Sequence, residues 1–405
     1  MDLVARIATK AAAVGGGLAG AVAVGAGSLW LWRHQVDVIL GRPLNEWTFS
    51  HGRVIVPTEN VPRSGPTRPL PVRLEPLDVR YRYGGRDHRL SELHPRTNTT
   101  SFLVLHGGTL IHEVYPGRFA GSGVRVFLFS LSKSVTSMLL GVALAEGAIS
   151  GVGDPVTLYR PDLAGCAYDG LSIEHLLDMC SGVGDLEDWT NPNALVNRFA
   201  EAVLGRGSVL DVVRSAQKFA EPGTVFNYST LDSQVLSWVL EAATGRTIAG
   251  YTAEKLWAKI GAEQDGFYGL TRSRPRTALG SGSLNACARD VARIGLVMAA
   301  GGRLHGEQVV PAEWAARSRG RGQPHLEVSA LGDSGYPHYG YANQWWTLGG
   351  DHRAFTGLGI HGQYLYVDPD AHVVIVKTSA WDSADDEDRD AETIAAFRAV
   401  VAHLA

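Results

Sequence analysis

Cysteine is scarce in this chain, which has three (Cys166, Cys180 and Cys287) among 405 residues. Three cysteines are too few for a disulfide framework, and their spacing matches no zinc-binding motif. At most one bridge could form, and we predict none. His106 and His112 have no third ligand at a recognisable spacing, so no metal site and no cofactor is predicted.

Clusters of positive charge are also lacking, and the formal net charge is −4. A nucleic-acid-binding domain needs a basic patch, so no nucleic-acid partner is predicted. The one dense run of charge is negative, from Asp382 to Asp390. It lacks the glycine turn and terminal glutamate of a calcium loop, so we expect a solvated acidic approach to the last helix.

The pattern Gly-x-Ser-x-Gly occurs nowhere in the chain. This absence argues against the α/β-hydrolases, whose nucleophile lies on that motif. The length and a hydrophobic content of 45% are ample for a large core. They fit one two-lobed domain or two close subdomains.

The chain has a single long uncharged apolar run, from Ala11 to Trp32, preceded by Arg6 and Lys10. A run of this length can span a bilayer, and tryptophans suit a membrane interface. We therefore predict a membrane anchor or signal segment over residues 1–35 and favour an uncleaved anchor. A cleaved export signal and a buried or amphipathic helix remain alternatives, and we expect the following domain to be extracytoplasmic or secreted.

Prolines interrupt residues 36–84, which predicts an extended linker. Two apolar runs flank Gly107-Gly108 and predict a hairpin over residues 102–115. Helical periodicity follows in residues 131–146, in several segments of 172–260 and in 286–301. A second hairpin (363–367 and 372–378) and a helix (391–404) end the chain. Strands from both ends around a helical middle predict an α+β domain over 85–405, with a helical lobe at about 150–280.

Ser130 and Lys133 lie three residues apart, where a short apolar stretch gives way to the helix expected from residue 131. Residues at this spacing share a helix face, so the lysine amine can reach the serine oxygen. A hydroxyl becomes a nucleophile when a base takes its proton, and burial lowers the pKa of a lysine toward that role. The same pattern at Ser215 and Lys218 lies in a polar helix, which we interpret as solvated surface.

Two further segments carry candidate residues. Tyr228 precedes a predicted helix, where a phenol can relay a proton. His361, Gly362 and Gln363 stand at the start of an alternating strand, whose edge amides can face an oxyanion.

These three ordered motifs resemble the serine hydrolases of the β-lactamase and penicillin-binding-protein superfamily. The resemblance covers roughly residues 85–400 and favours the class C-like branch, which includes family VIII carboxylesterases and 6-aminohexanoate-dimer hydrolases. His175 to Val183 and Gly280 to Asp290 are similar to two further segments of that branch. It implies a β-lactamase/transpeptidase-like fold, an antiparallel sheet flanked by helices with a mostly helical lobe.

The resemblance implies roles for single residues. Ser130 is expected to be acylated, Lys133 to share in proton transfer, and Tyr228 to act as general acid/base, although Thr230 departs from the family's Tyr-x-Asn or Tyr-x-Ser motif. His361-Gly362-Gln363 would stand for the Lys-Thr-Gly motif. Because that lysine helps to bind the substrate carboxylate, its replacement by His361 favours an esterase or amide hydrolase over a β-lactamase.

The substrate is expected to be a small ester or a linear amide. Candidate binding residues are aromatic, acidic or amide side chains: Glu187, Asp188, Trp189, Asn285, Tyr341, Trp345 and Trp346. The acidic pair is placed to meet a substrate amine, as the resemblance to 6-aminohexanoate-dimer hydrolases suggests, while core packing is the equal alternative for the Trp345-Trp346 pair. A D,D-peptidase or β-lactamase, and a catalytically silent membrane-anchored sensor domain, are the competing functions.

Overall fold

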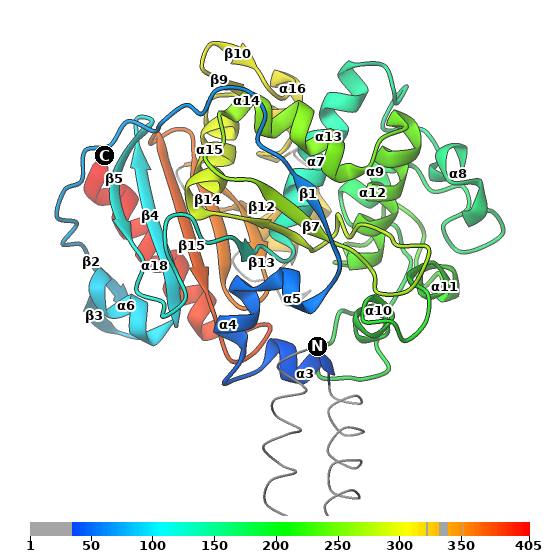
Figure 1. The fold of residues 1–405 in the computed structure, drawn as a ribbon, viewed down its shortest axis with the longest axis horizontal. Helices are drawn as coiled ribbons and strands as arrows, with labels where there is room; N and C mark the ends of the chain where they lie inside the picture. The colour runs from blue at the N-terminus through cyan, green and yellow to red at the C-terminus, as the bar shows by residue number, and fades with distance from the viewer. Residues whose placement is uncertain (1–34, 321–322, 332–338, 351) are drawn as a thin grey trace, which may run out of the picture.

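The structure is a computed structural model that describes residues 35–320, 323–331, 339–350 and 352–405. Its centre is a seven-stranded antiparallel sheet with the order β11-β12-β13-β14-β15-β4-β5 (Figure 1). The strands are β4 (Thr99–His106), β5 (Thr109–Val114), β11 (Tyr339–Ala342), β12 (Trp345–Leu348), β13 (Phe355–Gly359), β14 (Gln363–Asp368) and β15 (Val373–Ser379). Strands from the two ends of the chain thus lie side by side, since β15 pairs with both β14 and β4.

Both faces of this sheet are covered. Side chains alternate along β15, so Val374 and Val376 join one hydrophobic core while Val373 and Ile375 join another. Helices α7 (Leu131–Ala145) and α15 (Ala288–Ala299) pack on the first face, and α18 (Glu387–Leu404) covers the second. This arrangement confirms the predicted α+β class.

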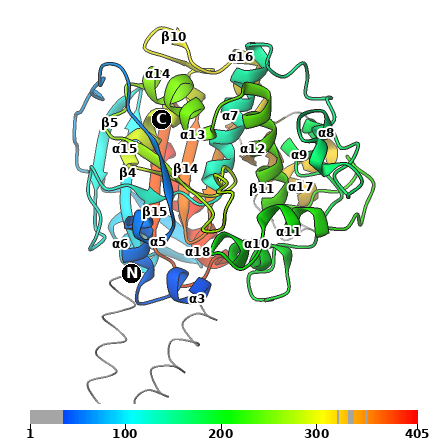
Figure 2. The same ribbon diagram turned by 45° about the vertical axis from the view of Figure 1, so that its right-hand side comes forward.

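A helical lobe lies beside the sheet (Figure 2). Its helices are α8 (Val156–Tyr159), α9 (Ile173–Leu177), α10 (Leu195–Val203), α11 (Val209–Ser215), α12 (Thr230–Thr244), α13 (Ile248–Thr252), a π-helical turn (Ala253–Trp257) and α14 (Ala258–Ile260). Helix α12 packs against α7, α8 and α9, so the lobe and the sheet share one core. Short elements after α15 complete the fold: β9 (Arg303–Leu304), β10 (Glu307–Gln308), α16 (Ala312–Arg317) and α17 (Val328–Leu331).

Residues 36–84 depart from the expected linker. They form α3 (Gln35–Leu40), α4 (Asn45–Ser50), α5 (Gly52–Ile55), β1 (Thr58–Val61) and β2 (Arg80–Tyr83), followed by β3 (Arg86–Arg89) and α6 (Leu90–Arg96). Strand β1 pairs with β7 (Gly266–Gly269) and is the edge of a second sheet, completed by β8 (Leu284–Ala286) and β6 (Val126–Phe127). The prolines exclude long helices, but the segment is built into the domain.

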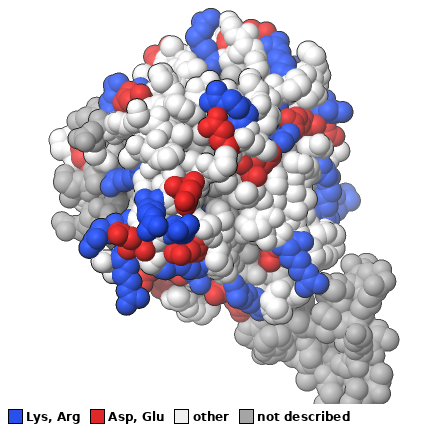
Figure 3. Space-filling model, turned by 90° about the vertical axis from the view of Figure 1, so that its left-hand side faces the viewer, with Lys and Arg blue, Asp and Glu red and all other residues white. Residues whose placement is uncertain are grey.

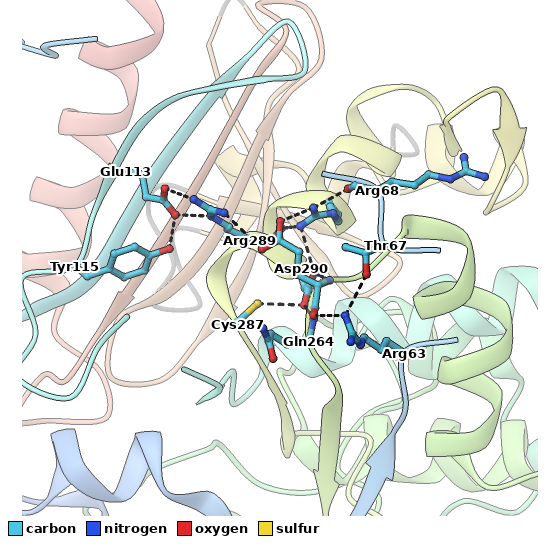
Figure 4. Close-up of polar contacts among 11 residues, drawn as sticks. Arg63, Thr67, Arg68, Glu113, Tyr115, Gln264, Cys287, Arg289 and Asp290 are labelled. Atoms are coloured by element: carbon cyan, nitrogen blue, oxygen red, sulfur yellow. Dashed lines mark hydrogen bonds and ion pairs between the residues drawn. The ribbon is translucent and has the colours of Figure 1, made fainter. Parts of the chain in front are cut away.

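A polar network fastens the stretch between β1 and β2 to the rest of the domain (Figure 4). The Arg63 amide donates to Asp265 at 2.9 Å, and the buried Arg293 side chain donates to the Arg68 carbonyl at 2.8 Å. Arg293 also pairs with Glu263 at 2.7 Å. A buried guanidinium needs such partners to offset its lost hydration, so this network holds the segment in place.

The main elements predicted from periodicity are present, including both hairpins and the helices at α7, α15 and α18. The apolar run predicted as an anchor or signal lies outside the described residues. Within the described ranges, no helix is both long and apolar enough to cross a membrane. On the face that carries β5 and the β2–β3 hairpin, basic and acidic side chains are interspersed (Figure 3).

Candidate active site

Ser130 occupies the N-cap position of α7, at the end of a turn from the short strand β6. Phe129 adopts a left-handed conformation (φ 48°), which turns the chain sharply before the helix. The Ser130 side chain makes no capping hydrogen bond, so its Oγ is available to another partner. Ser130 is partly exposed and lines a cavity, so a bound molecule could reach it.

Lys133 lies one helical turn further on, with 2% of its surface exposed. Its Nζ is 2.9 Å from Ser130 Oγ, 3.0 Å from Thr230 Oγ1 and 2.9 Å from the Ser281 carbonyl oxygen. Burial lowers the pKa of Lys133 to about 8, while the Glu187 carboxylate acts to raise it. A neutral amine can donate to Thr230 and Ser281 and still accept the Ser130 proton.

The second Ser-x-x-Lys pattern serves as an internal comparison. Helix α11 ends at Ser215, whose Oγ donates to the Val212 carbonyl, and both Ser215 and Lys218 are exposed. The predicted distinction between the two patterns is therefore confirmed, because only the copy at Ser130 is built into the core.

Tyr228 lies on the loop before α12, with its ring centroid 5.1 Å from Lys133 Nζ. The ring stacks on Trp346 at 5.2 Å and meets Tyr341 edge to face at 6.1 Å. The aromatic side chains fix the plane of the phenol beside the amine. The structure thus brings Ser130, Lys133 and Tyr228 together.

Glu187, expected to meet a substrate amine, lies next to Lys133 inside the site. Its carboxylate accepts the Thr230 amide at the start of α12, and burial raises its pKa while Lys133 opposes that shift. The neighbouring Asp188 is exposed and is held by the amide and hydroxyl of Thr190 at 2.8 and 2.6 Å. Glu187 is therefore electrostatically coupled to the lysine.

A cavity of about 930 Å³ opens in front of Ser130. Aromatic side chains form much of its wall: Trp189, Phe219, Phe226, Tyr228, Tyr339, Trp346, Tyr364 and Trp381. Its acidic residues are Glu187, Asp188, Asp385, Asp386, Glu387, Asp388 and Asp390. Among the described residues that line it there is no lysine, arginine or histidine. The cavity is thus suited to apolar and cationic groups.

The acidic run from Asp382 to Asp390, which extends into the first turn of α18, has a second role that the sequence did not indicate. Asp386 caps α18 by accepting a hydrogen bond from the Arg389 amide at 3.0 Å. This capping agrees with the expected acidic approach to the last helix. Asp390 accepts the hydroxyls of Tyr339 and Tyr364, two residues of the cavity wall. The run therefore also forms one side of the cavity.

His361, Gly362 and Gln363 do not line this cavity. His361 is buried in the turn after β13, with Nδ1 2.9 Å from the Trp381 carbonyl oxygen. The Gln363 side chain donates to the Ser379 carbonyl at 2.8 Å, on the far side of the turn. The backbone that lines the cavity at this hairpin is therefore at Leu358 and Gly359, at the end of β13, and not at His361–Gln363 as expected.

The strand that packs against the start of α7, beside Ser130, is β13. A Cβ at Gly357 would lie 3.1 Å from Leu131 and Ser134, so a larger residue would have to displace these side chains, and glycine favours the close packing of β13 on α7. Strand β12 pairs only with Phe355 and Thr356, which leaves one edge of Gly357–Gly359 without a partner strand. Leu358 and Gly359 line the cavity. This contact joins segments that are more than 200 residues apart, so no local sequence pattern indicated it.

The remaining predicted residues are divided between cavity and core. Trp189 and Trp346 line the cavity, whereas Trp345 is fully buried and packs edge to face on Phe355. Asn285 is also fully buried, and its amide donates to the Ser283 carbonyl at 2.9 Å. Among the described residues, no three metal-binding side chains converge.

Residues 93–399 match the model of the family described as Beta-lactamase. The chain belongs to the beta-lactamase family. A 6-aminohexanoate-dimer hydrolase from Paenarthrobacter ureafaciens is 33% identical over 351 residues, which cover 85% of this chain and 87% of that protein. The predicted superfamily is confirmed, and the chain is a hydrolase of the beta-lactamase superfamily.

Solved structures agree with this assignment. A Bacillus anthracis protein provisionally assigned as a 6-aminohexanoate-dimer hydrolase has a TM-score of 0.80 and 25% identity, over 90% of this chain and 96% of that one. A family VIII carboxylesterase has a TM-score of 0.55 and 18% identity, over 74% and 92% of the two chains. The second likeness concerns the fold alone.

Proposed function

We propose that this chain hydrolyses linear amides or carboxylic esters through an acyl-enzyme on Ser130, and that its substrates carry a cationic amine. The observation that carries the first part is the 2.9 Å contact between Ser130 Oγ and a lysine whose pKa is lowered by burial. The observation that carries the second is the charge of the cavity, which is acidic and aromatic.

In the acylation step, the neutral Lys133 amine takes the Ser130 proton as Oγ attacks the carbonyl carbon. The tetrahedral oxyanion accepts hydrogen bonds from the Ser130 amide and from the free edge of β13 at Gly357–Gly359. Tyr228 and Lys133 return the proton to the leaving amine or alcohol. Water then attacks the acyl carbon, gives up a proton to the same pair and releases Ser130.

The cavity argues against recognition of a substrate carboxylate. β-Lactams and cell-wall peptides present such a group, and an anion placed among the acidic side chains of this cavity would be repelled. The exposed side chains of Leu186, Phe219 and Val225 at its rim favour a flexible apolar chain. An aminoalkyl acyl group combines both properties.

Three nitrophenyl esters of matched length test this proposal. The acyl group carries an amine, a methyl group or a carboxylate at its end. We expect kcat/KM to fall in that order, by about tenfold or more between the first and last at low ionic strength, because unlike charges attract across a low-dielectric cavity. Added salt should narrow the difference. A preference for the carboxylate ester would contradict the proposed specificity.

Labelled penicillin and 6-aminohexanoate dimer extend the same assay, with intact mass used to detect an adduct on Ser130. Dimer or ester turnover without a stable penicillin adduct is expected. A long-lived penicillin adduct would indicate a D,D-peptidase or β-lactamase instead. If none of the substrates is turned over or forms an adduct on Ser130, the domain is catalytically inactive.

The pH dependence provides a separate prediction. Because Lys133 acts as a base, kcat/KM should rise with pH along a limb centred near the Lys133 pKa of about 8. The Glu187 carboxylate raises that pKa, so Glu187→Gln should move the limb to lower pH. Asp188→Asn is the matched control and should leave the midpoint in place. A limb that does not move in the Glu187 variant would show that the two groups are not coupled.

A further inference from the structure

Helix α4, which lies before the segment matched to the family, packs directly behind the site. Phe49 is 4% exposed and packs against two rings, with centroid distances of 4.9 Å to Phe129 and 5.0 Å to His361. Phe129 and His361 are themselves 5.6 Å apart. The three rings form one cluster.

The two partners of Phe49 occupy decisive positions in the chain. Phe129 immediately precedes Ser130, and His361 lies in the turn that directly follows β13. Both hold left-handed backbone conformations, with φ of 48° and 61°. Non-glycine residues adopt this region at a cost, so surrounding contacts must maintain it. Phe49 supplies contacts to both.

Asn45, one turn earlier on α4, bonds to the segment that follows β15, which His361 also contacts. Its Nδ2 donates to the Trp381 carbonyl at 2.9 Å and to the Ala380 carbonyl at 3.4 Å. His361 Nδ1 also donates to the Trp381 carbonyl at 2.9 Å, because a carbonyl oxygen can only accept. Asn45 and His361 therefore share one acceptor on the segment that leads from β15 into the cavity wall.

Helix α4 is itself held in place. Phe119 donates its amide to Glu46 at 3.2 Å, and the Thr48 hydroxyl donates to the Ile39 carbonyl of α3 at 2.5 Å. Gly52, just after the helix, packs so closely on Phe127 that a Cβ would lie 2.6 Å from that ring. The element thus contacts strand β6, the turn after β13 and the end of β15 together.

We infer that α4 is a positioning element for the reaction, in which Phe49 and Asn45 hold the Ser130 amide and the β13 edge at the spacing that an oxyanion needs. The inference rests on the proposed function. Phe49 and Asn45 are not among the described residues that line the cavity. Both therefore act through their contacts with Phe129, His361 and Trp381. Their effect should fall on the reaction step and leave substrate binding nearly unchanged.

Phe49→Leu and Asn45→Ala test this role in the full-length protein, with a nitrophenyl ester as substrate. We expect kcat to fall about tenfold or more while KM stays within about twofold. The rate at which a fluorophosphonate modifies Ser130 should fall in parallel, because that reaction uses the same oxyanion donors. Phe199→Leu is the matched control, as Phe199 is equally buried, on α10, and does not line the cavity.

Thermal unfolding of all variants separates positioning from loss of fold. If Phe49→Leu and Asn45→Ala match Phe199→Leu in kcat and in labelling rate, α4 has no positioning role. A rise in KM with unchanged kcat would equally overturn it. An inactive and unlabelled parent protein would instead refute the proposed function, and the two failures are thus distinguishable.

Discussion

Replacing Ser130 with alanine should lower kcat for an ester by on the order of a millionfold, which corresponds to about 8 kcal/mol of transition-state stabilisation. The change removes only Oγ, the atom that forms the acyl bond. Because Ser130 makes no capping hydrogen bond, α7 should keep its stability and the variant should fold. The checks are turnover and intact mass after incubation with a fluorophosphonate.

The chain supplies a matched control in Ser215→Ala, which alters the serine of the exposed second pattern. That variant should retain parental turnover and labelling. Near-parental activity in Ser130→Ala would contradict the assignment of Ser130 as the nucleophile, because alanine cannot form the acyl-enzyme.

Lys133→Met should lower kcat by at least about ten thousandfold, but by no more than Ser130→Ala does. Methionine keeps an unbranched chain in the buried space but cannot accept the Ser130 proton. The double variant should be little worse than either single one, because nucleophile and base act as a unit. Lys218→Met, at the solvated counterpart, should leave kcat unchanged. Additive losses in the double variant would contradict the shared role.

The same substitution has an expected effect on stability. The pKa of Lys133 is about 8 in the folded protein against an ordinary value of 10.5. Between pH 8 and pH 10.5 the unfolded chain binds a proton at Lys133 that the folded chain has released. The free energy of unfolding therefore rises with pH across that window, by about 3 kcal/mol in all. Lys133→Met removes this cost, and its advantage over the parent should shrink between pH 7 and pH 10.5 in denaturant unfolding. A constant difference would mean that the amine is hydrated.

Local sequence pattern was sufficient to predict much of the fold and the proximity of Ser130 and Lys133 in the candidate site. The spacing of apolar residues predicted the β4–β5 hairpin, α7 and α18. Each of these elements buries one or both faces, so its apolar residues recur at a regular spacing along the chain. The Ser130–Lys133 pair could be recognised for the same reason, as its spacing matches one helical turn.

The strand that lies beside Ser130 could not be located in this way. His361-Gly362-Gln363 leads into β14, which pairs with β13 along the whole hairpin. Which of these two strands faces Ser130 depends on the packing of Gly357 against α7, a contact between segments more than 200 residues apart. Such a contact leaves no periodic signal.

The proline-rich segment shows a related limit. Prolines correctly argued against long helices in residues 36–84, yet four residues of β1 pair with β7 far along the chain. Short elements held by distant partners have too few residues to show a period. Their order comes from tertiary contacts, of which the Arg63–Asp265 bond is one.

The pairing of β15 with β4 has a consequence for biosynthesis. Thr100 and Thr378, bonded across these strands at 2.7 Å, are separated by 278 residues. A ribosome therefore releases the β4–β5 hairpin long before the strand that completes its sheet exists. During translation the free edge of β4 is open to pairing with other nascent chains, so premature termination before β15 should yield aggregates instead of a smaller hydrolase.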